Sequence, residues 1–538
     1  MDKMFVDVMG EVTVTKDGAT LLRKIDVEHP AAKVIIEASN AVDNEVGDGT
    51  TSVVVLAGAL VRRAEELLAI GIAPSTIIDG YSNALDICLK ALEKVSRKYD
   101  SSDRLVMKRL VRTCLASKPL LYAGDKVLDI ILQAILSVTD FTKNEADTDS
   151  IKIEEKQGNI TDLELVSGVV IDKTIDSSSM PKAVAPARII LVDDDLEGKR
   201  TRTEAEIRID SPEMIKSYSE GETMMIKSKV QHIVDSGANV VISRKGINTL
   251  AQSLLKEHGI ISIRRVKEND LLWLAKATGA RVSARLDHEH DHQHEHHHHH
   301  DHHYLHHDIE ITLGHSERVY EKPVGDDRMV FVEGCKDPRA VTILIRANSK
   351  RMLDELHRST LDAISVLGDF IKSPLVVAGG GATEAAIARR VRAQAGNYEG
   401  REQLVIQKFA DALEEIPVVI AKNAGMNPID TLVELRSRHA LSNGKAQTVG
   451  VDAFGRKVKD MLPDVIEPAI VKEQVIKSAV EAVILLIRVD DVLMAKPKVQ
   501  THTHDDGTEH SHAGGDREHR HDHFDRLGKK QRQMHHYY

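Results

Sequence analysis

Along the 538 residues of the chain, the sequence pattern changes from helical to α/β and back to helical. This order of patterns constrains the fold more than any single motif. Residues 30–98 place apolar side chains at intervals of three and four, which is typical of helices. Residues 188–284 alternate short apolar runs with helical stretches, which indicates an α/β arrangement. From about residue 350 to residue 494 the pattern is mostly helical again. One domain is therefore expected to be inserted into another, and the length predicts about three domains.

The composition argues against several classes of function. A formal net charge of −11 does not suit a protein that binds a phosphate backbone, so no nucleic acid is expected as a partner. The cysteines, Cys88, Cys114 and Cys335, have unrelated spacings that indicate neither a disulfide framework nor a cysteine metal site. The first ten residues are not a signal peptide, and no apolar run is long enough to cross a bilayer. We therefore expect a cytoplasmic protein without a membrane partner.

The segment GDGTTS, residues 47–52, stands directly before an apolar helical run. Backbone N–H groups at a helix start, together with two glycines, two hydroxyls and a carboxylate, can hold a phosphate chain and its Mg²⁺. Asp and Thr are also common at ordinary helix N-caps that bind nothing. The spacing alone favours the ordinary cap.

Three further signals are weak when taken singly. Asp17 lies in TKDGAT, where an Asp-Gly pair usually forms only a turn. GGGAT, residues 379–383, stands between an apolar strand and a helix, which suits a nucleotide but also simple packing. Asp362 lies in a helical run, where a solvated or capping carboxylate is the ordinary expectation.

Taken together and in this order, these segments resemble the signature of the group II chaperonins. The resemblance runs from the first residues to about Pro497, and the matching stretches are MDKMFVD, TKDGATLL, DVEHPAAK, EVGDGTTSVVVLAG, FVEGC, GGGATE, AKNAGMNPID and RVDDVLMA. It implies a multidomain fold with a mostly α equatorial domain, an α/β apical domain with a helical protrusion, and a small α+β intermediate domain. It also implies identical or homologous subunits in a double ring, unfolded proteins as clients, and a lid whose closure ATP hydrolysis drives.

The resemblance implies a nucleotide site as well. Asp48 looks like the ligand of Mg²⁺, the metal ion that accompanies ATP. The phosphates of ATP would be held by the neighbours of Asp48, which are Gly47, Gly49, Thr50 and Thr51. The ribose and base would be lined by Gly379, Gly380 and Gly381.

Catalytic roles follow from the same resemblance. Asp17 and Asp362 would flank the γ-phosphate, and Asp362 would orient the attacking water from the intermediate domain. Lys156 resembles the lysine of the nucleotide-sensing loop of the family, although a lysine at the surface end of a strand is the simpler interpretation.

The chain is predicted to pass from the equatorial through the intermediate to the apical domain and back again. The predicted segments are 1–97 (equatorial, first part), 98–167 (intermediate, first part), 168–344 (apical), 345–378 (intermediate, second part), 379–497 (equatorial, second part) and 498–538 (a His-rich disordered tail). Within the apical segment, a lid protrusion is expected at 211–237.

The match begins late within the family pattern. Members carry an N-terminal helix and a Leu-Gly-Pro-x-Gly loop before the Met-Asp-Lys-Met block, and here Met1 stands at that block. Either the start codon has been assigned too late or the product is a degenerate subunit, and the presence of Asp17, Asp48 and Asp362 favours the first explanation. A non-hydrolysing structural subunit of a mixed ring is the alternative function.

Histidine-rich tracts set the chain apart from the family, and of the 21 residues from 287 to 307, 13 are His. Neutral imidazoles with interspersed carboxylates suit Zn²⁺ or Ni²⁺, so a metal-binding protein on a chaperonin scaffold is a further alternative. The other interpretation is a solvated polar linker. The candidate ligands are His288, His290, His292, His294, His296, His297, His298, His299, His300, His302 and His303.

Overall fold

The fold was obtained as a computed structural model. It describes residues 3–6, 10, 12–15, 17–116, 118–194, 196–197, 212–284, 286, 311–335, 340–441, 446–493, 500–503 and 509–512. The chain divides into two compact units, Met1–Ile487 and Arg488–Tyr538. The His-rich tract at 287–307 lies outside the described residues. In the described part, no helix combines the length and the apolar character that a membrane span requires.

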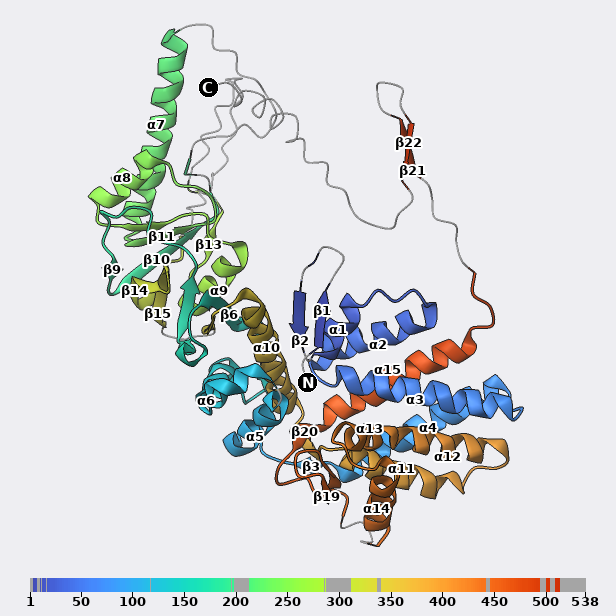
Figure 1. Ribbon diagram of the computed structural model, residues 1–538. Helices are drawn as coiled ribbons and strands as arrows, with labels where there is room; N and C mark the ends of the chain where they lie inside the picture. The colour runs from blue at the N-terminus through green and yellow to red at the C-terminus, as the bar shows by residue number, and fades with distance from the viewer. Residues whose placement is uncertain are drawn as a thin grey trace, which may run out of the picture. The chain divides into compact units, whose positions relative to one another are not determined.

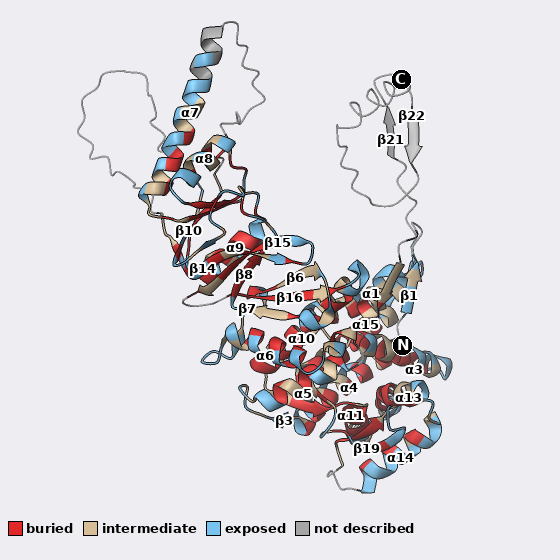
Figure 2. Ribbon diagram, turned by 60° about the vertical axis from the view of Figure 1, so that its left-hand side comes forward, coloured by how far each residue is buried: buried red, intermediate tan, exposed pale blue. Residues whose placement is uncertain are grey.

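The largest buried core is helical and draws on two distant parts of the chain (Figure 1). Its amphipathic helices each turn an apolar face inward, as Figure 2 shows for the buried residues. Near its centre, the rings of Tyr81 and Phe409 meet edge to face with centroids 5.4 Å apart. The helices of this core are α2 (Pro30–Val46), α3 (Thr50–Ala69), α4 (Pro74–Val95), α11 (Ala382–Ala395), α12 (Arg401–Leu413), α13 (Glu415–Asn423) and α15 (Ala469–Arg488).

Smaller elements surround this helical core. Near the N-terminus, β1 (Lys3–Val6) and β2 (Val12–Thr15) pair antiparallel as a hairpin and lead to α1 (Gly18–Lys24). β17 (Leu375–Ala378) lies between β3 (Arg97–Lys98) and β20 (Ile466–Pro468). A separate small core joins α14 (Pro428–Leu441) to the pair β18 (Val449–Asp452) and β19 (Lys457–Asp460).

A second core combines three helices with a three-stranded sheet. The helices are α5 (Arg104–Leu115), α6 (Lys126–Ser137) and α10 (Lys350–Lys372). The central strand β16 (Val341–Ala347) runs parallel to β6 (Ile151–Gln157) and antiparallel to β7 (Glu164–Val166). The connections contain β4 (Thr139–Asp140), β5 (Glu145–Ala146) and the short 3₁₀ helices η1 (Pro119–Ala123), η2 (Thr148–Ser150) and η3 (Ile160–Asp162).

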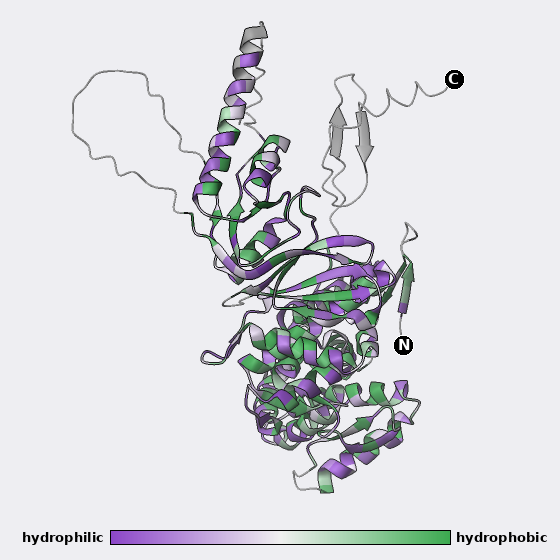
Figure 3. Ribbon diagram, turned by 90° about the vertical axis from the view of Figure 1, so that its left-hand side faces the viewer, coloured by the Kyte–Doolittle hydropathy of each residue, from purple (hydrophilic) through white to green (hydrophobic). Residues whose placement is uncertain are grey.

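The third core is an α/β arrangement around an eight-stranded mixed sheet. Its main path has the order β12-β11-β10-β14-β15-β8, with β13 paired to β10 and β9 paired to β14. The strands are β8 (Gly168–Ile171), β9 (Ala183–Val184), β10 (Ala187–Val192), β11 (Val240–Ser243), β12 (Ile261–Ile263), β13 (Val282–Ser283), β14 (Gly314–Val324) and β15 (Asp327–Cys335). Hydrophobic residues predominate in β10 and β11, whereas β14 carries many polar side chains (Figure 3). Three helices accompany the sheet, α7 (Pro212–Asp235), α8 (Thr249–Glu257) and α9 (Glu268–Thr278).

The segment predicted as a lid protrusion, 211–237, contains one long helix, α7. Ile226, Val230 and Ile233 of its later turns are buried against the sheet, whereas Met224 is 71% exposed. The helix is therefore anchored at its C-terminal end, and its role as a lid stays a prediction.

Two details differ from the predicted segments. The boundary placed between residues 344 and 345 falls inside β16, and the whole strand pairs with β6 and β7 because its apolar residues complete the second core. The tail was expected to be disordered throughout, but β21 (Gln500–Thr503) and β22 (Glu509–His512) pair antiparallel.

Candidate functional site

Sequence-distant polar residues surround a cavity of about 310 Å³ at the junction of the helical core with α10. Its walls come from the starts of α1, α3 and α11 and from α5, α10, α13 and α15. The lining residues are Asp17, Gly18, Gly47, Asp48, Gly49, Thr50, Thr51, Ser52, Thr113, Cys114, Lys118, Asp362, Gly380, Gly381, Ile416, Ile420, Glu467 and Lys472.

The turn between α2 and α3 forms one wall. Gly47 ends α2 and Gly49 precedes α3, and both have left-handed backbone with φ of 62° and 87°. Among the described residues no side chain caps α3, so the alternative of an ordinary Asp or Thr N-cap is wrong here. The N–H groups at the start of α3 therefore stay available to an anion. Asp48 between the glycines accepts a hydrogen bond from the Gly49 N–H at 2.7 Å.

Asp17 is the N-cap of α1 and also lines the cavity. Its carboxylate accepts hydrogen bonds from the N–H groups of Ala19 and Thr20, at 3.2 and 2.7 Å. Burial acts to raise the pKa of Asp17, but these hydrogen bonds and the charge of Lys118 outweigh it and lower the pKa. Asp17 is consequently an ionised carboxylate at neutral pH.

Asp362 enters the cavity from α10 and forms an ion pair with Lys118. Both side chains are largely buried, with 18% and 14% of their surfaces exposed. Burial is the largest influence on the carboxyl group and raises the pKa of Asp362 to about 6, although Lys118 acts in the opposite direction. A carboxylate with such a pKa is suited to accept a proton or to hold a water molecule near neutral pH.

The glycine-rich turn before α11 forms the opposite wall. Gly380 and Gly381 have φ of 66° and 74° and line the cavity, whereas Gly379, also predicted there, is not among its described lining residues. No described side chain caps α11, although the N–H of its first residue, Ala382, donates to the Gly379 carbonyl at 3.2 Å. The following N–H groups of the first turn therefore have no side-chain cap among the described residues.

A buried charge cluster lies beside this wall. Lys472 of α15 contacts Glu384 at 2.9 Å and Glu467 at 2.6 Å, and Lys472 and Glu467 line the cavity. Burial raises the pKa of Glu467, and Lys472 opposes that effect. The cluster joins α11, β20 and α15 at the edge of the cavity.

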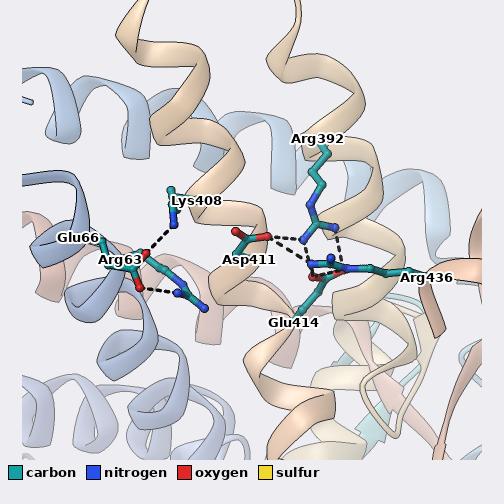
Figure 4. Close-up of polar contacts among 7 residues, drawn as sticks. All are labelled: Arg63, Glu66, Arg392, Lys408, Asp411, Glu414 and Arg436. Atoms are coloured by element: carbon teal, nitrogen blue, oxygen red, sulfur yellow. Dashed lines mark hydrogen bonds and ion pairs between the residues drawn. The ribbon is translucent and has the colours of Figure 1, made fainter. Parts of the chain in front are cut away.

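An ion-pair cluster links α11 and α14 to the end of α12, where α13 begins (Figure 4). Ile416 and Ile420 of α13 line the cavity. Glu414, at the junction of α12 and α13, contacts Arg392 of α11 at 2.7 Å. Asp411 contacts Arg392 at 2.7 Å and Arg436 of α14 at 3.3 Å. Because buried carboxylates are stable only when paired, these contacts hold the end of α12 in a defined position.

The comparisons with known proteins agree with this geometry. The model of the TCP-1/cpn60 chaperonin family matches residues 1–497. The chain belongs to this family. The chaperonin chain is 43% identical over 500 residues to a thermosome subunit of Methanopyrus kandleri, covering 92% of this chain and 88% of that protein. It is 44% identical over 503 residues to thermosome subunit alpha of Archaeoglobus fulgidus, with the same coverage.

A solved structure supports the same assignment. An open-state monomer of a group II chaperonin from Methanococcoides burtonii matches with a TM-score of 0.60 and 33% identity. The match covers 82% of this chain and all of that one. The predicted multidomain chaperonin fold is therefore confirmed.

Lys156, like Gly379, is a predicted site residue that is not among the described lining residues of the cavity. Its ammonium pairs with Asp172 and Asp327, each at 2.8 Å, and it is absent from the described lining residues. Its predicted role in nucleotide sensing has no contact that supports it here.

Several residues of the cavity were not predicted. Lys118, Glu467 and Lys472 lie in or beside helices, where the sequence pattern indicates only solvated charge. Cys114 was considered only for disulfides and metals, yet its Sγ lies 3.8 Å from the Lys118 Nζ. The signal that could have identified Lys472 is its position among the apolar residues Val471 and Val475.

The residues present fit Mg²⁺ with a nucleotide better than a transition metal. Asp48 and Asp17 supply the carboxylate oxygens that Mg²⁺ prefers, next to two open helix N-termini. Within the described ranges, no group of three or more His, Cys, Asp or Glu side chains could hold a metal ion. The candidate histidines from His288 to His303 lie outside those ranges.

Proposed function

We propose that this chaperonin chain binds Mg·ATP in the cavity and hydrolyses it as a subunit of a double ring that encloses unfolded proteins. The observation that carries the proposal is the meeting of Asp17, Asp48 and Asp362 with two open helix N-termini around one cavity. Helix N-termini attract phosphate, and carboxylates attract the accompanying Mg²⁺. Family membership and the group II chaperonin fold support the same conclusion.

The lining residues that belong to the predicted motifs each have a role in this proposal. Asp48 binds the Mg²⁺, which would neutralise part of the phosphate charge. Thr50 and Thr51 would hold the phosphates through their backbone N–H groups and hydroxyls. The N–H groups of Gly47 and Gly49 donate to Asp43 and Asp48, so these two glycines would instead let the phosphates approach the backbone closely. On the opposite wall, Gly380 and Gly381 leave room for the ribose and base.

Asp17 and Asp362 act at the γ-phosphate of ATP, which hydrolysis releases. Asp17 is fixed as the cap of α1, so its position relative to the α3 turn is defined. Asp362 accepts a hydrogen bond from the attacking water, and its raised pKa suits a group that takes up the proton of that water. Positioning of this kind is the main contribution of the protein to phosphoryl transfer.

Hydrolysis would be coupled to movement because the catalytic groups belong to different cores. Asp48 follows α2 of the helical core, whereas Asp362 lies on α10 of the second core. A shift between these cores changes the distance from Asp362 to the phosphates. The predicted equatorial, intermediate and apical domains correspond to these three cores in our proposal, with β16 assigned to the intermediate one.

The partners and location follow from the family. Identical or homologous chains would complete the ring, and unfolded proteins would be the clients that α7 encloses as a lid. We infer a cytoplasmic location. Binding of Zn²⁺ or Ni²⁺ to the histidine tract is a separate proposal that rests on composition alone.

The experiment is a comparison of Asp362→Ala and Asp48→Ala with the unchanged protein. Asp362→Ala should lower turnover by about 100-fold or more while nucleotide affinity is kept, because the phosphate cradle stays intact. Asp48→Ala should weaken Mg·ATP binding by at least about tenfold, because a direct ligand of the metal is lost. Steady-state phosphate release and calorimetric titration measure the two effects.

Asp354→Ala provides a matched control, because Asp354 lies on the same helix as Asp362 but not among the described lining residues. Unchanged turnover in Asp362→Ala would remove that residue from the catalytic site. An unchanged protein that binds Mg·ATP without hydrolysing it would favour the alternative of a structural subunit in a mixed ring.

A further inference from the structure

The second core and the α/β core are connected by the chain at two places, after β7 and before β16. Thr342 of β16 joins the two crossings, because its hydroxyl donates to the Gly168 carbonyl at 3.0 Å and accepts from the Val170 N–H at 3.1 Å. An apolar cluster that includes Val166, Val170 and Leu344 lies beside them. Two crossings that lie together form a hinge, since a few backbone torsions there can change the angle between the cores. Fixing that angle requires a contact to one side of the crossings.

Helix α9 of the α/β core makes such a contact with η2, which precedes β6 of the second core. β16 separates β6 from β7 in the sheet, so this contact lies to one side of the crossing after β7. Trp273, the only tryptophan of the sequence, donates from its indole Nε1 to the Asp149 carbonyl at 2.8 Å. Lys276, three residues later on α9, donates to Asp147 Oδ2 and Ser150 Oγ, each at 3.0 Å. These hydrogen bonds connect one face of α9 to a single short turn of the second core.

A buried ion pair accompanies these hydrogen bonds. Lys152 of β6 contacts Asp270 of α9 at 2.5 Å, and 5% and 7% of the two side chains are exposed. Lys152 also contacts Glu154 at 2.9 Å and donates to the Val170 carbonyl at 2.7 Å. Its ammonium lies 5.5 Å from the centroid of the Trp273 ring. Because separating a buried ion pair leaves uncompensated charges away from water, we expect this contact to stay closed when the cores move.

The second-core side of this contact is packed against α10. η2 contacts α10, and the two approach closely at Gly368, where an added Cβ would lie 3.1 Å from Thr148 Cγ2. The same helix carries Asp362, which lines the cavity. The elements α10, η2 and α9 thus form an unbroken series of contacts from the cavity to the α/β core.

Two other sets of ion pairs between these cores are more exposed than the pair of Lys152 with Asp270. Lys322 of β14 contacts Glu164 of β7 at 3.4 Å, and 43% and 45% of these side chains are exposed. The partners of Lys156, which are Asp172 and Asp327, are 47% and 65% exposed. Exposed ion pairs contribute little because water and salt screen them. The contact of α9 with η2 and β6 is therefore the strongest of these three polar connections.

We propose that the contact of α9 with η2 and β6 is a rigid link, which passes the movement of α10 during ATP hydrolysis to the α/β core and its helix α7. This inference rests on the proposed ATPase function. Trp273 and Lys276 are not among the described lining residues of the cavity, so they take no part in the chemistry. Breaking the link should therefore separate hydrolysis from the response of α7.

The test uses the full chain with Trp273→Phe/Lys276→Met, which removes the side-chain hydrogen bonds to η2 and keeps an aromatic ring and an aliphatic chain in their places. Its kcat for ATP should stay within about twofold of that of the unchanged protein, because both changes are remote from the cavity. Trypsin cleavage at Lys216 of α7, whose side chain is 79% exposed, measures how accessible this helix is and is followed by mass spectrometry. Mg·ATP should slow this cleavage by about tenfold or more in the unchanged protein and by less than about twofold in the double variant.

Lys322→Met is the matched control, because Lys322 also belongs to the α/β core and pairs with the second core, but at an exposed site. This variant should keep both the kcat and the slowing of cleavage by Mg·ATP. Circular dichroism checks folding. If the double variant does not fold, Trp273→Phe and Lys276→Met are judged separately by the same criteria.

Trp273 also reports on the link directly, because no other tryptophan contributes to the fluorescence of the chain. Since a rigid link does not open, acrylamide should quench this fluorescence equally with and without Mg·ATP, and more strongly in Lys276→Met. Quenching that rises with Mg·ATP in the unchanged protein would overturn the rigid link, and so would normal slowing of cleavage in the double variant. An unchanged protein that does not hydrolyse ATP would overturn the proposed function, and the link with it.

Discussion

Gly49 shows how closely the turn between α2 and α3 is packed against the rest of the helical core. Its φ of 87° lies in the left-handed region, and a Cβ at this position would come within 2.6 Å of Val475 Cγ2 and 3.2 Å of Val471 Cγ1. Both valines belong to α15, at the other end of the chain. A side chain at position 49 would therefore strain the backbone and push the turn away from α15.

We predict that Gly49→Ala damages both stability and nucleotide binding. Left-handed backbone costs an L-residue about 1–2 kcal/mol, so unfolding free energy should fall by at least that amount. The displaced turn should weaken Mg·ATP binding by about tenfold or more. Gly58→Ala is the control, because Gly58 lies within α3 and a Cβ added there would meet no atom within 4 Å. This substitution should raise the unfolding free energy by about 0.5–1 kcal/mol. Urea unfolding measures the stability of both variants, and titration with Mg·ATP measures their nucleotide affinity. Equal stability and equal affinity in Gly49→Ala and Gly58→Ala would contradict this prediction.

The sequence allowed part of the site to be predicted at this scale. Asp17, Asp48 and Asp362 were predicted because family motifs surround them, and the structure brings all three to one cavity. Lys118 and Lys472 were not predicted, because a lysine in a helical pattern is ordinarily solvent-exposed and only the packing of distant segments buries it. Their burial is a tertiary effect.

At the scale of elements, strand β6 shows contacts of Lys156 that its local sequence does not reveal. Lys152 and Lys156 lie four residues apart and so project from the same face of the strand. Lys152 contacts Asp270 of α9 at 2.5 Å, and Lys156 contacts Asp172 and Asp327. Both lysines thus join the second core to the α/β core, a relation that local sequence cannot reveal.

The elements themselves were largely predictable, and their partners were not. The hairpin of β1 and β2 follows from Val-rich alternation around Gly10. The apolar run VTILIRA likewise favours a strand, but its place between β6 and β7 depends on segments nearly two hundred residues away in sequence. Periodicity defines the type of an element, whereas pairing depends on which apolar faces meet.

The histidine tract gives a prediction at the same scale. The residues on either side of it are anchored, because Leu286 is buried and its N–H donates to Asp194 at 3.0 Å, and Ile311 packs against the α/β core. Deleting residues 288–307 should therefore leave ring assembly and ATPase activity intact. It should lower the number of bound Zn²⁺ or Ni²⁺ ions, and uptake should be lost below about pH 5.5, where imidazoles are protonated.

Calorimetric titration at neutral and acidic pH measures the number of bound metal ions, and electron microscopy shows whether rings assemble. The unchanged protein and the deletion variant are titrated under identical conditions. Equal metal stoichiometry in the two proteins would identify the tract as a solvated linker. Loss of rings would mean that the tract is a structural element.

At the scale of the whole molecule, the cores differ in whether their residues come from one continuous segment of the chain or from two distant segments. The α/β core lies entirely within residues 169–340, whereas the helical core combines residues 38–95 with residues 377–483. We predict that a fragment of residues 168–340 unfolds cooperatively, with a urea midpoint that circular dichroism can measure. A fragment of residues 1–167 should show no cooperative transition, because α2, α3 and α4 lack α11, α12 and α15. A sharp transition in the shorter N-terminal fragment would contradict this prediction.

The divided helical core has a consequence during synthesis. α2, α3 and α4 leave the ribosome long before the segments from 377 onward that cover their apolar faces. At about 5–20 residues per second, this delay is on the order of tens of seconds. The α/β core can close in that interval, but the first helices stay exposed to other nascent chains. A newly made copy of this chaperonin therefore passes through the same aggregation-prone state in which a client protein is bound.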